Sequence, residues 1–373
     1  MQTRPTRAYI DLNALEHNFL EIKKRLPEEV KILAVVKADA YGHGAIEISK
    51  KLETLGCDML GVALCEEGIE LRKAGINSPI IVLSGIYRAQ IKDIVRYNLT
   101  PVIFDIDQAG DLNHILTGMD KSARVHVKID TGMGRLGLMP NDISKFFNEI
   151  KELKSLKIEG VLSHFTEADK ENKLFTKDQF KRFEDVIKTI NDMGITPSYR
   201  HISNSAAIIN FPSSYLNLVR PGIMLYGSHP AEAFRDKIDL LPVMSLTTEI
   251  IQLKWVPKNY PISYSRTFIT QRDSLIATIP IGYGDGYFRS LSGKADVLVK
   301  GKRVPVAGRI CMDMTMIDVT NLQAVKVGDK VTIIGRQNGE EITAEELASR
   351  AGTISYEIFC SINQRVPRVY IEQ

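Results

Sequence analysis

Two kinds of pattern alternate along the chain between about residue 30 and residue 225. Short apolar runs rich in Val, Ile and Leu are followed by longer stretches in which apolar residues recur every three or four positions. The short runs are typical of buried strands and the longer stretches of amphipathic helices. We expect strands at residues 32–37, 59–64, 80–84, 100–104, 123–129, 158–163, 199–203 and 217–220. Eight successive βα units predict an α/β fold, a (β/α)8 TIM-like barrel rather than an open doubly wound sheet.

The pattern changes after about residue 240. Closely spaced strands divided by Gly and Pro replace the alternation of strand and helix, for example at residues 246–251, 274–279, 295–299 and 330–334. Such spacing is typical of a β-rich domain. We therefore expect a C-terminal mainly-β domain over residues 241–373. No low-complexity linker separates it from the barrel, so the two domains should pack firmly.

Composition narrows the class of ligand. The 48 Lys and Arg residues are interleaved with 45 Asp and Glu residues, so the net charge of +3 predicts binding neither to nucleic acid nor to a membrane surface. No apolar stretch is long enough for a membrane span or a signal peptide, and we expect a cytoplasmic protein with a small-molecule substrate. The four cysteines have no metal-ligand spacing and are too few for a disulfide framework, so no metal is expected.

Polar residues gather where the predicted barrel strands end. These residues are Lys37, Lys128, Asp130, His164, His201, Asn204 and Arg220. In (β/α)8 barrels the active site is built from the C-terminal ends of the strands and the loops that follow them. The sequence therefore predicts that these side chains face one mouth of the barrel.

Lys37 stands at the end of an apolar run, where a buried ammonium costs several kcal/mol unless it is paired or neutralised. Burial lowers the pKa of a lysine and makes its amine a nucleophile able to form an imine with an aldehyde. An arbitrary lysine at a strand end more often reaches solvent. Asn204, Ser205 and residues 220–223 lie where barrels often bind phosphate, although Pro221 and Gly222 also suit an ordinary turn. Together, a reactive lysine and a phosphate site predict pyridoxal 5'-phosphate as the cofactor.

Several ordered motifs across nearly the whole chain carry a family resemblance. They are Val-Lys-Ala-Asp-Ala-Tyr-Gly-His-Gly (36–44), Lys-Ile-Asp-Thr-Gly-Met-Gly-Arg-Leu-Gly (128–137), Gly-Arg-Ile-Cys-Met-Asp (308–313), and residues 9–12, 164–165, 201–205, 220–223 and 365–368. The sequence resembles the bacterial alanine racemases, which are pyridoxal-phosphate enzymes with a barrel and a β domain. In that family the N-terminal stretch joins the β domain. The resemblance thus places residues 1–11 there and the barrel over 12–240.

The resemblance also implies roles for the residues at the barrel mouth. Lys37 would hold the cofactor as a Schiff base, and Arg220 would face the pyridine nitrogen and keep it unprotonated, supported by a hydrogen bond from His164. Arg135 would bind the cofactor's phenolic oxygen and the substrate carboxylate. His201 is either a further supporting group or an ordinary core histidine. The phosphate group would be held by Tyr41, Asn204, Ser205, Gly222, Ile223 and Tyr356.

Racemisation needs an acid and a base on opposite faces of the reacting carbon, and the resemblance assigns the second base to Tyr264 of a partner subunit. The active unit would be a homodimer with shared sites that interconverts L-alanine and D-alanine, supplying D-alanine for peptidoglycan. Cys311, Met312 and Asp313 would also act across the interface. A substrate corridor would be lined by Asp169, Tyr283, Arg289, Arg309 and Ile354.

Two positions raise questions within the resemblance. Lys128 would lie beside Arg135 without an evident anionic partner; many relatives carbamylate this lysine, and the alternative is a salt bridge to Asp130. Ser265 follows Tyr264 where relatives usually have glycine, which affects the fine positioning of the tyrosine. Asp39 is a known variation in the first motif.

Three alternatives remain open. A decarboxylase of the same fold would place glutamate, not Arg220, at the pyridine nitrogen. A racemase of broader specificity, acting for example on serine, is typically exported with a signal peptide. A non-catalytic protein that binds the cofactor would commonly lack the β domain and Tyr264.

Overall fold

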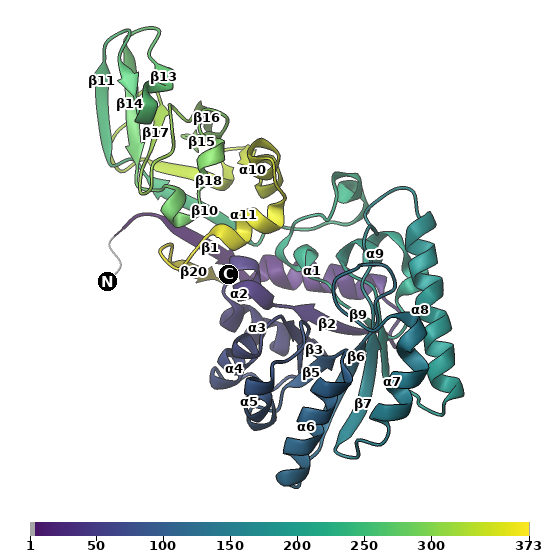
Figure 1. The fold of residues 1–373 in the computed structure, drawn as a ribbon. Helices are drawn as coiled ribbons and strands as arrows, with labels where there is room; N and C mark the ends of the chain where they lie inside the picture. Colours follow the sequence, from purple (N-terminus) through teal and green to yellow (C-terminus); the bar gives the residue numbers. More distant parts are fainter. Residues whose placement is uncertain (1–3, 373) are drawn as a thin grey trace.

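The first domain is a closed parallel barrel. The computed structural model describes residues 4–372, and an eight-stranded parallel sheet forms the centre of this domain (Figure 1). Its strands are β2 (Lys31–Val35), β3 (Met59–Val62), β4 (Ile80–Val82), β5 (Thr100–Ile103), β6 (Ala123–Lys128), β7 (Leu156–Leu162), β8 (Tyr199–His201) and β9 (Leu218–Val219). Strands β2 to β8 pair in chain order, and β9 pairs back with β2. Between β8 and β9 a bridge joins Asn204 to Arg220. The predicted barrel and mainly-β domain are confirmed.

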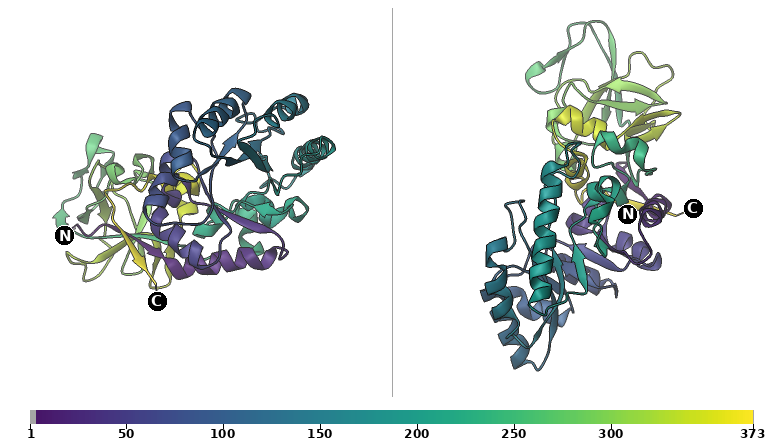
Figure 2. Two further views of the ribbon diagram at one scale, coloured as in Figure 1. Left: turned by 90° about the horizontal axis from the view of Figure 1, so that it is seen from below. Right: turned by 90° about the vertical axis from the view of Figure 1, so that its right-hand side faces the viewer.

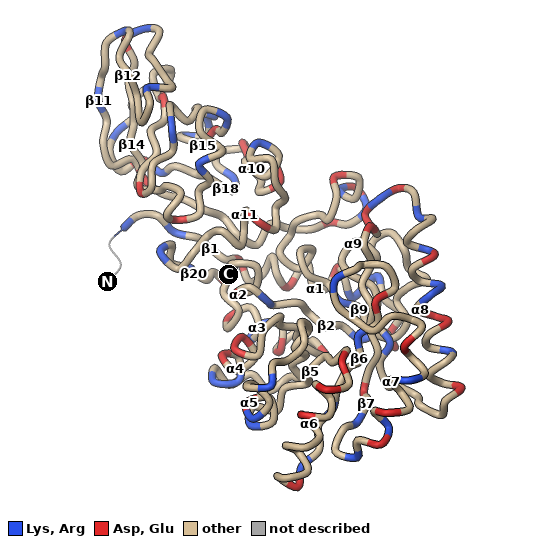
Figure 3. The backbone as a smooth tube through the Cα atoms, viewed as in Figure 1, with Lys and Arg blue, Asp and Glu red and all other residues tan. Residues whose placement is uncertain are grey.

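Helices surround the strands of the barrel (Figures 1 and 2). They are α1 (Leu12–Arg25), α3 (Ala45–Thr54), α4 (Cys65–Lys73), α5 (Ile91–Arg96), α6 (Ile106–Gly118), α7 (Ile143–Ile150), α8 (Leu174–Asp192) and α9 (Ser205–Asn210). In α8 the buried residues Phe180, Phe183 and Ile190 lie on one side, as the helical period requires. Acidic and basic residues are interleaved over the outer surfaces (Figure 3). No helix in residues 4–372 is both long enough and apolar enough to cross a membrane.

The second domain is built mainly from antiparallel sheets and lies to one side of the barrel (Figure 2). Its strands are β10 (Met244–Glu249), β11 (Gln252–Val256), β12 (Pro261–Ile262), β13 (Phe268–Ile269), β14 (Ser274–Ile279), β15 (Asp296–Val299), β16 (Lys302–Pro305), β17 (Thr315–Asp318), β18 (Lys330–Gln337), β19 (Glu340–Ile342) and β20 (Arg368–Ile371). Two helices follow β19: α10 (Ala344–Ala351) and α11 (Ser355–Ser361). The N-terminal strand β1 (Arg7–Asp11) lies in the seven-stranded sheet of this domain, between β10 and β20. The boundary near residue 240 stays a prediction.

The first barrel strand ends earlier than expected. The sequence predicts Lys37 as its last residue, but β2 stops at Val35 and Lys37 begins the short element α2 (Lys37–Gly42). The N–H of Val36 still bonds to the carbonyl of Gly61, yet its ψ of 17° has left the extended region. Lys37 therefore stands on the turn beyond the strand.

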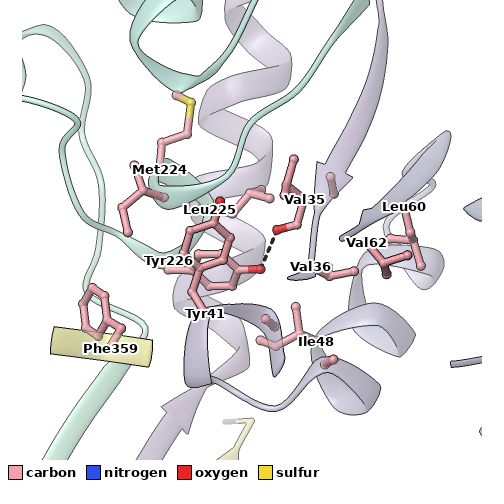
Figure 4. Packing of buried hydrophobic residues seen from close by; sticks show 14 of the residues in the cluster. Val35, Val36, Tyr41, Ile48, Leu60, Val62, Met224, Leu225, Tyr226 and Phe359 are labelled. Carbon is pink, nitrogen blue, oxygen red and sulfur yellow. Dashed lines mark hydrogen bonds between the residues drawn. The ribbon is translucent and has the colours of Figure 1, made fainter. Parts of the chain in front are cut away.

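The two domains meet at α2 and α11. Tyr41 and Tyr226 pack together with their ring centres 5.0 Å apart, and Phe359 of α11 lies beside them (Figure 4). The hydroxyl of Tyr226 donates to the carbonyl of Val35 over 2.9 Å. Arg368 of β20 donates to the carbonyl of Gly42 over 2.8 Å. The β domain thus supports the segment that carries Lys37.

Candidate active site

A cavity of about 710 Å³ opens at the C-terminal ends of the barrel strands. Thirteen residues named in the sequence analysis line it: Lys37, Tyr41, Lys128, Arg135, His164, Asp169, Asn204, Ser205, Arg220, Gly222, Ile223, Ile354 and Tyr356. Ile354 and Tyr356 come from the β domain of the same chain. Sequence reasoning missed other lining residues, among them Ser84, Thr166 and Cys360, because no motif marks them. Ser84 and Thr166 follow β4 and β7, so the barrel rule alone could have found them.

The cavity is strongly cationic. Its described lining residues include one carboxylate, that of Asp169, and four basic side chains: Lys37, Lys128, Arg135 and Arg220. Burial lowers the pKa of Lys37, and the nearby charge of Arg135 lowers it further. A lysine with a lowered pKa exposes a larger fraction of free amine at neutral pH. The cavity therefore suits an anionic ligand with an electrophilic carbonyl.

The segment after Lys37 is a turn of left-handed helix. Residues 38–41 have φ between 52° and 54° and ψ between 40° and 52°, although none of them is glycine. This conformation costs about 1–2 kcal/mol per residue. Local hydrogen bonds hold it: Ala40 N–H donates to the carbonyl of Val36, and the Asp39 carboxylate accepts from Ala45 N–H over 2.7 Å. Strain of this size persists where the surroundings over-determine it, often beside an active site.

His43 braces this turn from below. Its side chain is fully buried, and its Nδ1 lies 3.0 Å from the carbonyl oxygens of both Ala40 and Tyr41. Because carbonyl oxygens only accept, Nδ1 must carry the hydrogen. Burial lowers the pKa of His43 to about 4, so the ring is neutral. Its ring also stacks on Tyr226 at 4.6 Å.

One end of the cavity is shaped by a glycine. The N–H of Gly222 donates to the Ser205 hydroxyl over 2.9 Å, and a Cβ at position 222 would lie 2.7 Å from the Tyr41 hydroxyl oxygen. Burial raises the pKa values of Tyr41 and Tyr356, so both hydroxyls remain protonated and able to donate. These residues place hydroxyl donors at one end of the cavity.

Arg220 is held by several acceptors. Its Nη2 donates to the carbonyls of Ser163 over 2.7 Å and Ile202 over 3.1 Å, and lies 3.2 Å from His164 Nδ1. Its Nη1 donates to His201 Nδ1 over 2.9 Å. Burial and the charge of Arg135 lower the pKa of Arg220 to about 9, which leaves the guanidinium charged at neutral pH. His201 is thus a partner of Arg220 and not a passive core group.

Lys128 is nearly buried and, among the described residues, has neither an ion pair nor a hydrogen bond to its amine. The Asp130 carboxylate instead accepts backbone N–H groups, including that of Gly132 over 2.8 Å. The salt bridge between Lys128 and Asp130 that the sequence left open is therefore absent. Burial and the charges of Arg220 and Arg135 lower the pKa of Lys128 well below its usual value.

The residues expected to act across an interface lie far from this cavity, on the β domain. Tyr264 begins the short turn η6 (Tyr264–Arg266), and its side chain is 68% exposed. Ser263 donates to the carbonyl of Arg309, and the N–H of Tyr283 donates to that of Cys311. We call this group the β-domain cluster: Ser263, Tyr264, Tyr283, Arg309, Cys311, Met312 and Asp313. Arg289 lies in the same domain, and no member of the cluster lines the cavity of its own chain.

The backbone around Tyr264 is also left-handed. Ser263, Ser265 and Arg266 have φ values of 64°, 61° and 50°. Ser265 is the position where the resemblance expects glycine, which adopts positive φ without steric cost. The serine therefore introduces backbone strain next to Tyr264.

Comparisons with known proteins agree with the geometry. Family models described as the N-terminal and C-terminal domains of alanine racemase match residues 10–230 and 243–370. An alanine racemase of Geobacter sulfurreducens is 47% identical over 375 residues, covering 100% of this chain and 98% of that protein. Alanine racemase 2 of Caldanaerobacter subterraneus subsp. tengcongensis is 45% identical over 371 residues, covering 99% and 96%. The solved alanine racemase of Clostridium difficile 630 has a TM-score of 0.94 at 41% identity and covers 100% of this chain and 97% of that one. The chain belongs to the alanine racemase family of isomerases.

Proposed function

We propose that this protein interconverts L-alanine and D-alanine with pyridoxal 5'-phosphate bound in the barrel cavity. The observation that carries the proposal is the amine of Lys37, with its lowered pKa, in a cationic cavity opposite Arg220. The protonated hydroxyls of Tyr41 and Tyr356 and the hydroxyl of Ser205 line the cavity near Gly222 and would supply donors to the phosphate. Lys37 would bind the aldehyde. Tyr41, Asn204, Ser205, Gly222, Ile223 and Tyr356 would surround the phosphate.

When bound, the cofactor acts as an electron sink that acidifies the α-proton of the amino acid. The remaining steps belong to the chain. Arg220 would present its guanidinium to the pyridine nitrogen, and Arg135 would anchor the substrate carboxylate. The amine of Lys37 would hold or return the proton on the D side.

The L side needs a second proton donor on the opposite face. Lys37 in the cavity is assigned to the D side, while Tyr264 is exposed on the β domain of the same chain and does not line the cavity. Met312 and Ile354 are also exposed, at 52% and 61%. Large apolar side chains that gather on a surface usually mark an interface. We therefore infer a homodimer in which the partner subunit's Tyr264 completes the site and its Cys311, Met312 and Asp313 approach the substrate.

We also infer that Lys128 is carbamylated. A lysine with a lowered pKa offers the free amine that reacts with carbon dioxide, and the product is an anion between the cations Arg135 and Arg220. This modification supplies the negative partner that the described residues do not give Lys128. We further propose that the enzyme acts in the cytoplasm, where its D-alanine would serve peptidoglycan synthesis.

The test uses purified protein loaded with pyridoxal 5'-phosphate. Borohydride should attach the cofactor to Lys37, and alanine incubated in deuterated water should exchange its α-proton while both enantiomers accumulate. A carrier protein would give the borohydride product without exchange. A decarboxylase would release carbon dioxide from its substrate, and a panel of amino acids including serine measures the width of specificity. Absence of α-proton exchange with alanine would overturn the proposal.

A further inference from the structure

A column of polar side chains runs through the inside of the barrel below the cavity. It consists of Arg220, His201 and His126, which are buried, and Glu159, whose side chain is 14% exposed at the far end. Barrel interiors are normally packed with branched apolar side chains. Buried polar groups destabilise a fold unless every one of them finds a partner. Such a column calls for a functional explanation.

Hydrogen bonds connect these four residues head to tail. Arg220 Nη1 is 2.9 Å from His201 Nδ1, His201 Nε2 is 2.9 Å from His126 Nδ1, and His126 Nε2 is 3.4 Å from Glu159 Oε2. A guanidinium only donates, so His201 Nδ1 must accept and its Nε2 must carry the hydrogen. The same reasoning applied once more gives His126 the Nε2–H tautomer. That hydrogen points at Glu159.

The charge states agree with this direction. Burial and the charge of Arg220 lower the pKa of His201. Burial also lowers the pKa of His126 and outweighs the hydrogen bond and charge of Glu159, which raise it, so both rings are neutral. Burial disfavours the ionised form of Glu159, but the hydrogen bond from His126 and the charge of Arg124 outweigh it and lower the pKa. The column therefore runs from a permanent cation to an anion. A chain of neutral imidazoles between such ends has one favoured orientation.

The backbone of β7 is adapted to this column. The pairing of β6 with β7 shifts register so that Val125 faces Ile158 and His126 faces Gly160, which leaves Glu159 as the extra residue of a β-bulge. Bulges of this kind re-aim a side chain. A Cβ at Gly160 would lie 2.5 Å from His126 Nδ1, so only glycine leaves room for the ring. Two independent backbone features thus make space for the column.

We propose that His126 and Glu159 are positioning residues that lock His201 in one tautomer and thereby hold Arg220 in its orientation. The carboxylate of Glu159 fixes the hydrogen of His126, which fixes that of His201, which must then accept from Arg220. Loss of the carboxylate frees both rings to reverse, and a reversed His201 would present N–H to the guanidinium. That Arg220 faces the pyridine nitrogen of the cofactor rests on the proposed function. The tautomers of His201 and His126 are a property of the chain without cofactor.

The first experiment therefore uses the cofactor-free protein. In ¹⁵N-histidine-labelled protein, long-range ¹H–¹⁵N spectra should show His126 and His201 as neutral rings with hydrogen on Nε2. Glu159→Leu should convert a substantial fraction of both rings to the other tautomer, and Glu159→Gln, whose amide oxygen still accepts, should restore the native pattern. Glu152→Gln is the matched control, because Glu152 is an exposed carboxylate just before β7. His43, which carries its hydrogen on Nδ1, reports misfolding because Glu159→Leu should leave it unchanged.

The second experiment uses the loaded enzyme. Substitution of a residue that acts through a network changes a free energy by about 0.5–2 kcal/mol. If this is the activation free energy, Glu159→Leu should lower kcat about 2- to 30-fold with little change in KM for alanine. Glu159→Gln should recover most of the loss. The proposal is overturned if either ring carries hydrogen on Nδ1 or is charged in the native protein, or if Glu159→Leu changes neither tautomer. A correct tautomer pattern with no racemisation would contradict the proposed function and leave the lock intact.

Discussion

Two segments of this chain carry the proposed bases, and both have left-handed backbones without glycine. In the turn after Lys37, Ala40 and Tyr41 are buried and His43 donates to both of their carbonyls, while α11 and β20 of the same chain contact Gly42 directly after it. The turn at Tyr264 is exposed and has little besides Ser263 to hold it. A single chain therefore preorganises one half of the site completely. The other half is presented outward, and under the proposed function a partner subunit would complete it.

Subunit complementation tests whether Tyr264 acts in the active site of the partner subunit. Lys37→Ala and Tyr264→Phe should each lower racemisation by about 10²–10⁴-fold, because each removes an acid–base group. If Tyr264 acts across the interface, co-expression of the two variants restores one native site in every mixed dimer. Random pairing then recovers about a quarter of the sites.

If both bases acted within one chain, each site would keep a defect and nothing would be restored. Tyr260→Phe is the matched control for the tyrosine, since Tyr260 is a partly exposed tyrosine of the same domain with no proposed role. It should leave activity unchanged.

The amine of Lys128 has no anionic partner among the described side chains. Under the proposed function its negative charge comes from carbon dioxide. Lys128→Ala should lower kcat by raising the activation free energy by about 1–3 kcal/mol. This is the cost of leaving a buried polar partner unsatisfied. Chloride or a small carboxylate should restore part of the activity. Spectra of protein incubated with ¹³C-bicarbonate should show a carbamate carbon that Lys128→Ala lacks. A native protein with unmodified Lys128 in well-resolved density would contradict the carbamate.

His43 allows the bracing of the Lys37 turn to be tested through pH. Its pKa is about 4 in the fold, below the ordinary value of 6.5, so the unfolded chain binds more protons between these values. Stability should therefore fall as the pH drops from 6.5 to 4, by up to about 3 kcal/mol from this residue. His126, His164 and His201 add to the trend with the same sign.

Urea unfolding of His43→Asn measures that share. Asparagine can still donate to the two carbonyls and does not titrate, so its pH dependence should be shallower than that of the native protein. His43→Phe keeps the stacking but loses the donor, and should also weaken cofactor binding by disturbing the turn. An unchanged pH profile in His43→Asn would show that His43 does not carry this dependence.

The sequence predicted both domains well because their strands are apolar runs bounded by turn residues, and in the β domain β14 matched residues 274–279 completely. It misplaced Lys37 because alanines normally favour the right-handed helix, and the left-handed turn depends on specific hydrogen bonds and packing contacts that propensity does not reveal. Cys360 escaped notice because α11 reaches the cavity from the other domain. Glu159 was missed since its role depends on a bulge, which a strand pattern does not reveal.

Ser265 gives the smallest and most specific test of the exposed turn. Its φ of 61° costs a non-glycine residue about 1–2 kcal/mol, while glycine loses about 0.5–1 kcal/mol of chain entropy. Ser265→Gly should therefore raise the free energy of unfolding by up to about 1 kcal/mol, measured in urea at fixed protein concentration. Ser265→Ala removes the hydroxyl but keeps the strain, so it should show no gain. If alanine stabilises as much as glycine, the hydroxyl rather than the backbone is the source of the cost. If glycine also changes kcat, the strain contributes to how Tyr264 is presented to the partner chain.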